Sequence, residues 1–320
     1  MKRTERNLLV GVSLVLVLLF ILSSTDLVLT EKKSEVYVVS VLIDDDSNKS
    51  WDNFRMGVDN AAEKWNADVS FVTLYDKGST EQQQQLLSRE VENGADAIVL
   101  SPTDCSAILN AVDDVPVSIP IISLGAKLDS PRVRSVITSD SSAMGTALGN
   151  QIAADNESKS FSQVLEVTYR HNRTDTTLLS DSLGSALPHG LPMQKVTVSS
   201  SAEMDDLIMY IETLTEPTAI VATDSATLLS VAERLSPLEK QNISIYGTGW
   251  SGNLLRYIES GVISDVGVYS DYDLGYLSIE AAVKSLLGET ITAEYTVNQA
   301  LIAAEDIHSK KYEMMLFPIV

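Results

Sequence analysis

The chain has 320 residues, which is enough for one large or two medium-sized domains with buried cores. Its formal net charge is -21 at pH 7, so its surface repels phosphate backbones and we expect no nucleic-acid partner. The single cysteine, Cys105, can form no disulfide within the chain and has no second cysteine for a metal site.

The N-terminus carries an apolar segment behind a basic start. The uncharged run 8–22 has the length and flank of either a signal peptide or a short membrane anchor. No A-x-A cleavage site follows, which favours an uncleaved anchor, and no cysteine follows for a lipid anchor. We expect a signal-anchor or transmembrane helix at 1–25 and a polar tether at 26–35. The rest of the chain is then at the extracytoplasmic face of the cell membrane, or secreted if the segment is cleaved.

The first half of the remaining chain alternates between strand-like and helix-like stretches. One of these stretches, 50–67, places Phe54, Val58, Ala61 and Trp65 on one face, which is the spacing of an amphipathic helix. The predicted strands are 36–43, 68–76, 95–102 and 119–125, and the predicted helices between them are 50–67, 79–94 and 104–112.

The same alternation begins again after residue 160. The segments 97–104 and 219–224 echo each other, because each is an apolar strand that ends in Thr-Asp before a helix. Helices between unbroken apolar strands are typical of a parallel sheet covered on both faces, so we predict two similar α/β lobes. In this half the predicted strands are 162–169, 194–200, 217–224 and 243–249, and the predicted helices are 174–187, 205–214 and 225–235.

The candidate site follows from this pattern. In open α/β sheets, ligands bind beyond the carboxyl ends of the strands. The loops that follow predicted strands and carry polar or aromatic side chains are 44–51, 101–104, 223–225 and 248–252.

The loop 44–51 opens with three consecutive aspartates. A calcium loop of the EF-hand type would need glycine and glutamate where this chain has Lys49 and Arg55. Three adjacent aspartates also point in different directions, unlike a pair of catalytic carboxylates across a cleft. A solvated loop and ligand contact by Asp44 or Asp45 stay open as alternatives. We expect no catalytic residue, metal or cofactor.

The order and spacing of these pieces resemble the type I periplasmic (solute) binding proteins, in the ribose-binding-like branch. The stretches that carry the resemblance are SNKSWDNFRMG at 47–57, NGADAIVLSPTDCSAI at 93–108, IPIISLG at 119–125, VITSDSSAMG at 136–145, AIVATDSATL at 219–228, YGTGWSGNLLRYIESGVI at 246–263 and DYDLGYLSIEAAVKSLLGE at 271–289.

The resemblance implies two Rossmann-like lobes joined by a hinge of three crossovers. The crossovers are expected near 137–140, 267–271 and 295–299. The lobes would then comprise 36–138 with 270–296, and 140–267 with 297–320. Such a protein closes on a small ligand, usually a sugar.

The resemblance also implies a set of residues that contact the ligand, and this chain retains some of them. Asn48 and Trp51 match the family's asparagine and second aromatic residue after the first strand, whereas Ser50 replaces the first aromatic residue. Lys127 follows a Gly-Ala pair that stands where many sugar binders carry Asp-Arg.

The second lobe departs further from the family pattern. Threonines near Thr177 stand where the family has an arginine, and Asp224 with Ser225 corresponds to its Asn-Asp pair. Trp250 stands beside a lost aspartate, and the family's glutamine falls at Tyr269. The candidate ligand-binding residues are Asp44, Asp45, Asn48, Ser50, Trp51, Asp104, Lys127, Thr177, Asp224, Ser225, Trp250 and Tyr269.

The resemblance implies a membrane-anchored extracytoplasmic solute-binding protein that is not an enzyme. It would close on a small-molecule ligand, in this family usually a sugar, and present it to an ABC permease or a membrane sensor kinase. The alternatives are an enzyme on the same α/β scaffold and a repressor-like sensor domain without its DNA-binding part.

Overall fold

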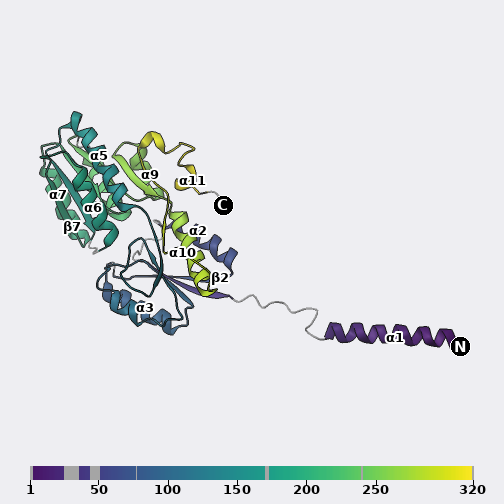
Figure 1. Ribbon diagram of the computed structural model, residues 1–320. Coiled ribbons are helices and arrows are strands. Elements are labelled where there is room, and N and C mark those ends of the chain that lie inside the picture. Colours follow the sequence, from purple (N-terminus) through teal and green to yellow (C-terminus); the bar gives the residue numbers. More distant parts are fainter. Residues whose placement is uncertain are drawn as a thin grey trace. The chain divides into compact units, whose positions relative to one another are not determined.

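The structure is a computed structural model that describes residues 3–24, 36–43, 51–76, 78–169, 173–238 and 241–318. The chain divides into two units, Met1–Val36 and Tyr37–Val320. The first unit contains the helix α1 (Arg3–Ser24), drawn in purple in Figure 1. This helix is long and apolar enough to cross a membrane, as the sequence predicts, although a signal sequence would share these properties.

The second unit begins with a six-stranded sheet in the order β11-β5-β4-β3-β1-β2, in which all neighbouring strands are parallel. Its strands are β1 (Tyr37–Ile43), β2 (Ala67–Thr73), β3 (Ala97–Leu100), β4 (Ile121–Leu124), β5 (Val133–Thr138) and β11 (Glu294–Thr296). Its helices are α2 (Asp52–Trp65), α3 (Thr80–Glu92), α4 (Leu109–Asp114) and α10 (Asp271–Leu286).

Side chains of β3 alternate between two cores in this lobe. Ala97 and Val99 pack in the same cluster as residues of α2 and α10, whereas Ile98 and Leu100 pack in the cluster of α3 and α4. Both faces of the sheet are therefore covered, as an apolar run without polar interruption predicts.

The other sheet has the order β12-β10-β9-β8-β6-β7, and only β12 is antiparallel to its neighbour. Its strands are β6 (Gln163–Tyr169), β7 (Met193–Val198), β8 (Thr218–Ala222), β9 (Ile243–Thr248), β10 (Ile263–Tyr269) and β12 (Gln299–Ile302). Its helices are α5 (Ser141–Lys159), α6 (Thr174–Ala186), α7 (Ser201–Thr213), α8 (Ser225–Leu235), α9 (Gly252–Glu259) and α11 (Glu313–Leu316), with 3-10 turns at Ser236–Leu238 and Ala304–Asp306.

These two sheets confirm the predicted fold class of two α/β lobes. Two predicted helices are wrong at their starts. The helix predicted at 205–214 begins earlier, at Ser201, and the helix predicted at 104–112 begins later. The Asp104 carboxylate accepts hydrogen bonds from the backbone N–H groups of Ser106 and Ala107, which holds a turn there. As a result α4 begins only at Leu109.

The chain passes between the sheets after β5, after β10 and between β11 and β12. After the first passage it forms α5, and after the second it forms α10. We propose the lobe boundaries 36–138 with 270–296 and 140–267 with 297–320, because this division follows the two sheets.

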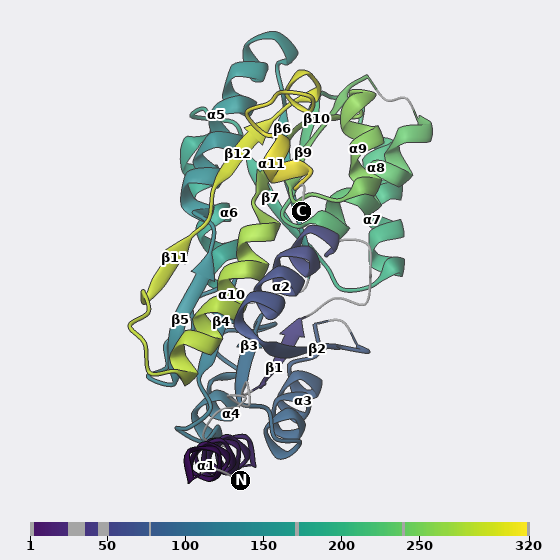
Figure 2. The ribbon, with the colours of Figure 1, turned by 90° about the vertical axis from the view of Figure 1, so that its right-hand side faces the viewer.

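Each lobe contains one helix pair in very close contact, α2 with α10 and α5 with α6; Figure 2 shows both pairs side by side. A Cβ atom on Gly57 or Gly275 would overlap a backbone carbonyl of the facing helix. The same holds for Gly145 and Gly149 in the second lobe. Glycine is therefore required at these positions to let two backbones approach.

Candidate functional site

A cavity of about 120 Å³ lies between the two lobes. Side chains from several strand ends and crossovers surround it, as the rule for open sheets predicts. Those used below are Trp51 and Ser101 from the first lobe, Arg173, Asp175, Thr223 and Thr248 from the second, and Tyr269 and Asp271 from the crossover between β10 and α10.

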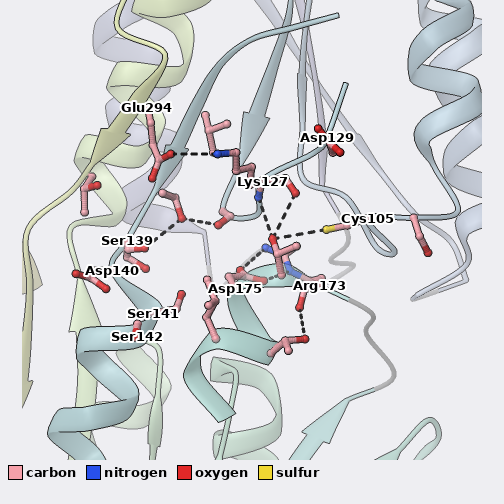
Figure 3. Close-up of a pocket in the computed structure, with 18 of the residues that line it drawn as sticks. Cys105, Lys127, Asp129, Ser139, Asp140, Ser141, Ser142, Arg173, Asp175 and Glu294 are labelled. Atoms are coloured by element: carbon pink, nitrogen blue, oxygen red, sulfur yellow. Dashed lines mark hydrogen bonds and ion pairs between the residues drawn. The ribbon is translucent and has the colours of Figure 1, made fainter. Parts of the chain in front are cut away.

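A larger cavity of about 870 Å³ adjoins it (Figure 3). The two cavities share Gly125, Ser139, Ser141, Arg173 and Asp175 in their walls. Crossover residues after β5 and residues of β11 complete the larger one. The site is thus an inner cavity that opens into a wider outer one.

Arg173 is the central cation of this site. Its Nε and Nη2 atoms donate to the two carboxylate oxygens of Asp175 at 3.0 and 2.7 Å, a two-point contact. Its Nη1 atom donates to Ser101 Oγ at 3.0 Å and to the carbonyl of Pro102 at 2.9 Å, in the opposite lobe. One side chain therefore connects both lobes across the cavity.

Burial and a neighbouring charge shift the pKa of Arg173 in opposite directions. Its side chain is only 15% exposed. Burial alone would lower the pKa of Arg173, but the charge and hydrogen bonds of Asp175 outweigh it and raise the pKa. The guanidinium is therefore a permanent cation at the cavity wall.

The position of Arg173 corrects an expectation from the sequence. Threonines near Thr177 were expected in place of an arginine, yet Arg173 stands at the N-cap of α6, one helical turn before Thr177. Thr177 lines the outer cavity, and its hydroxyl donates to the Arg173 carbonyl. The signal was present in the sequence, since Arg173 directly precedes the predicted helix 174–187.

Trp51 and Tyr269 are the predicted aromatic residues that line the inner cavity. Trp51 packs edge-on against the buried Phe54, with ring centroids 5.0 Å apart. Burial, together with the charge of Asp271, raises the pKa of Tyr269, so its hydroxyl keeps its proton at neutral pH. Burial also raises the pKa of Asp271 to about 7.

Lys127 lies at the rim of the outer cavity. Its side chain is 71% exposed, with Nζ 4.0 Å from Glu294 Oε2 (Figure 3). Its backbone N–H donates to Thr174 Oγ1 of the other lobe at 3.0 Å. The lysine backbone thus contributes to contact between the lobes, while its side chain faces solvent.

Two predicted aspartates serve as local caps. Asp224 is the N-cap of α8 and accepts from the backbone N–H and the hydroxyl of Thr227. Asp104 holds the turn before α4. Next to Asp224, Ser225 has a buried hydroxyl that meets no hydrogen-bond partner among the described residues. It packs against Gly249, and Thr223 and Thr248 of the same two loops line the inner cavity.

Trp250 is placed differently from the exposed aromatic face expected at that loop. The side chain is 7% exposed and belongs to the core of the second lobe. Its indole N–H donates to the Leu316 carbonyl at 3.0 Å, and its ring packs edge-on against Phe317. The C-terminal segment therefore covers the ring, because burial of a large aromatic side chain outweighs its exposure in a loop.

Four candidate residues, Asp44, Asp45, Asn48 and Ser50, lie outside the described residues. Within the parts of the chain that the structure describes, no group of three or more His, Cys, Asp or Glu side chains is placed to hold a metal ion.

Comparison with known proteins gives the family. The sequence matches no curated protein. Among solved structures, this fold resembles a carbohydrate transporter solute-binding protein from Agrobacterium radiobacter in complex with D-arabinose, with a TM-score of 0.80 at 18% identity over 88% of this chain and 98% of that one. An ABC transporter solute-binding protein from Agrobacterium vitis with bound D-fucose gives a TM-score of 0.77 at 15% identity, over 88% and 100% of the two chains.

A third similar structure is a XylFII–LytSN complex, with a TM-score of 0.74 at 16% identity over 85% of this chain and 100% of that one. Identities this low show the shared fold only. The sequence itself matches the family model described as periplasmic binding protein domain over residues 39–290. This match covers most of the chain, which therefore belongs to the periplasmic binding protein domain family.

Proposed function

We propose that this chain is a sugar-binding solute-binding protein and not an enzyme. The contact that carries the proposal is the one made by Arg173, which reaches Ser101 and Pro102 across the inter-lobe cavity. A fixed guanidinium beside hydroxyl-bearing side chains suits a ligand rich in hydroxyl groups. Trp51 adds a flat apolar surface that fits the C–H face of a sugar ring.

The proposed mechanism is closure of the hinge. Three chain passages join the lobes, so a change of backbone torsions there opens or closes the cleft. A ligand in the cavity touches both lobes in the closed form and one lobe in the open form. It therefore shifts the population toward the closed form by its difference in affinity.

The apolar helix α1 supports a place at the outer face of the cell membrane. A permease of the ABC type or a membrane sensor kinase would recognise and bind the closed form. Similar proteins support both partners, since some are ABC transporter components and XylFII occurs in a complex with LytSN.

Thermal unfolding of the full-length protein in detergent tests ligand binding. The first probes are D-arabinose, D-fucose and D-tagatose, which are bound in similar structures. We expect at least one sugar of a wider panel to raise the midpoint of unfolding. The absence of a response to every neutral, amino and acidic sugar would contradict the proposal.

A matched pair of variants then tests the site. Arg173→Lys keeps the positive charge but loses the two-point contact, so we expect at least about a tenfold loss of sugar affinity. Arg234→Lys is the control, because Arg234 pairs with Asp205 on the surface of the same lobe. Equal affinities of the two variants would place the ligand elsewhere.

A further inference from the structure

Asp271 lies in the wall of the inner cavity, where the chain enters α10. It is the first residue of α10, directly after the passage from β10, and it lines the cavity with Arg173, Asp175 and Tyr269. Among the described residues, these four are the titratable side chains in that wall. From the other side, α2 brings Phe54 and Gly57 against the first turns of α10, and neither carries a charge.

Of the residues that the structure describes, the basic side chains around both cavities already face carboxylates. Arg173 is held by Asp175, and Lys127 faces Glu294. Among the described residues, the Asp271 carboxylate has neither a hydrogen-bond donor nor a cation. Burial without such a partner explains why its pKa lies at about 7.

An unpaired carboxylate inside a protein is unfavourable, because burial removes water from the charged oxygens and no protein donor replaces it. Where such a group lines a cavity, a ligand that donates to it removes the unfavourable term. Two further described acids, Asp129 and Asp140 in the outer cavity, add to a negative field that repels anionic ligands.

We propose that Asp271 is the specificity-determining carboxylate of this site. It accepts hydrogen bonds from donor groups of the ligand, either two neighbouring hydroxyls or an ammonium group. The site therefore selects neutral or amino sugars over sugar phosphates and uronic acids. This inference rests on the proposed function and names its ligand class.

The experiment is calorimetric titration of the full-length protein in detergent at pH 8. The probes are D-arabinose, D-fucose and D-galactose, D-galactosamine as the cation, and D-galacturonate and D-galactose 6-phosphate as the anions. We expect a neutral or amino sugar to bind more tightly than either anion. Asp271→Asn should weaken that binding about 10- to 100-fold, because a charged acceptor is lost without a change of size.

The matched control is Asp273→Asn, two residues further along the first turn of α10, which should leave the affinity unchanged. Neutral-sugar affinity should also fall as the pH drops below about 7, since protonation removes the acceptor charge, and Asp271→Asn should flatten this profile. Sugar binding that is unchanged in Asp271→Asn, or tighter binding of an anion, would overturn the inference and leave the proposed function standing. Binding by none of the probes would contradict both.

Discussion

In both lobes a pair of helices packs closely at glycine residues, but the two lobes present different side chains to the cleft. In the first lobe α2 meets α10 at Gly57 and Gly275, and in the second α5 meets α6 at Gly145 and Gly149. In both lobes, a helix that follows a chain passage packs on the helix that follows the first strand of its lobe. The scaffold is thus repeated, while the residues at its cleft end are not.

The two tryptophans illustrate the difference. Trp51 follows the first strand of the first lobe and lines the inner cavity. Trp250 follows β9 in the second lobe and is buried under the C-terminal segment. Equivalent aromatic signals in the two lobes therefore place one ring in the cavity wall and the other in the core.

Replacing the two tryptophans gives the largest expected effect. Trp250→Ala should lower the free energy of unfolding by about 3 to 5 kcal/mol, because it empties a site in the core. Trp51→Ala should change stability much less and sugar affinity more. Chemical unfolding and ligand titration of both variants check this. Similar stability losses would show that Trp51 is also a core residue.

The glycines of the helix pairs give the next largest effect. Gly57→Ala and Gly145→Ala should each destabilise the protein by about 1 to 3 kcal/mol, because the new Cβ forces two backbones apart. Gly184→Ala is the control on α6, where the Cβ would meet only the flexible end of Met193. There the gain in helix propensity should leave stability unchanged or higher. A loss of stability in only one of these two variants would show that the two helix pairs do not depend on glycine in the same way.

The sequence predicts the fold well because unbroken apolar runs indicate which strands are buried on both faces. The apolar run around Val99 predicts a strand covered on both faces, and the structure has such a strand there. The site is harder to predict, because the direction of a side chain depends on contacts far along the chain. The predicted residue Thr177 lies one helical turn after Arg173, the residue that connects the lobes. Trp250 is covered by residues more than sixty positions later in the chain.

A smaller effect concerns the carbonyl of Leu316, which both lobes contact. Asn53 Nδ2 of α2 and Trp250 Nε1 each donate to it at 3.0 Å. Asn53→Ala and Trp250→Phe should each destabilise the protein by about 1 kcal/mol through the lost hydrogen bond. Since both act on one acceptor, the double variant should depart from additivity. Additive losses in unfolding experiments would show that the two donors act independently.

The smallest expected effect is a pH dependence in the second lobe. Burial, together with the charge of Asp155, raises the pKa of Asp265 on β10 to about 6. Burial alone would raise the pKa of Asp155 as well, but hydrogen bonds from Lys159 and Tyr246 outweigh it and lower the pKa. The two acids should therefore affect stability with opposite signs.

The folded state holds the Asp265 proton more tightly than the unfolded state, so this residue lowers stability as the pH rises from about 4 to about 6. Asp265→Asn should thus raise the unfolding midpoint at pH 8 and leave it almost unchanged at pH 4. Asp155→Asn should lower the midpoint at pH 8, because the ionised carboxylate stabilises the fold above its ordinary pKa. Both shifts are small because solvent screens these partly exposed groups. Shifts of the same sign in the two variants would show that the acids of the second lobe act as one charge cluster and not as opposed partners.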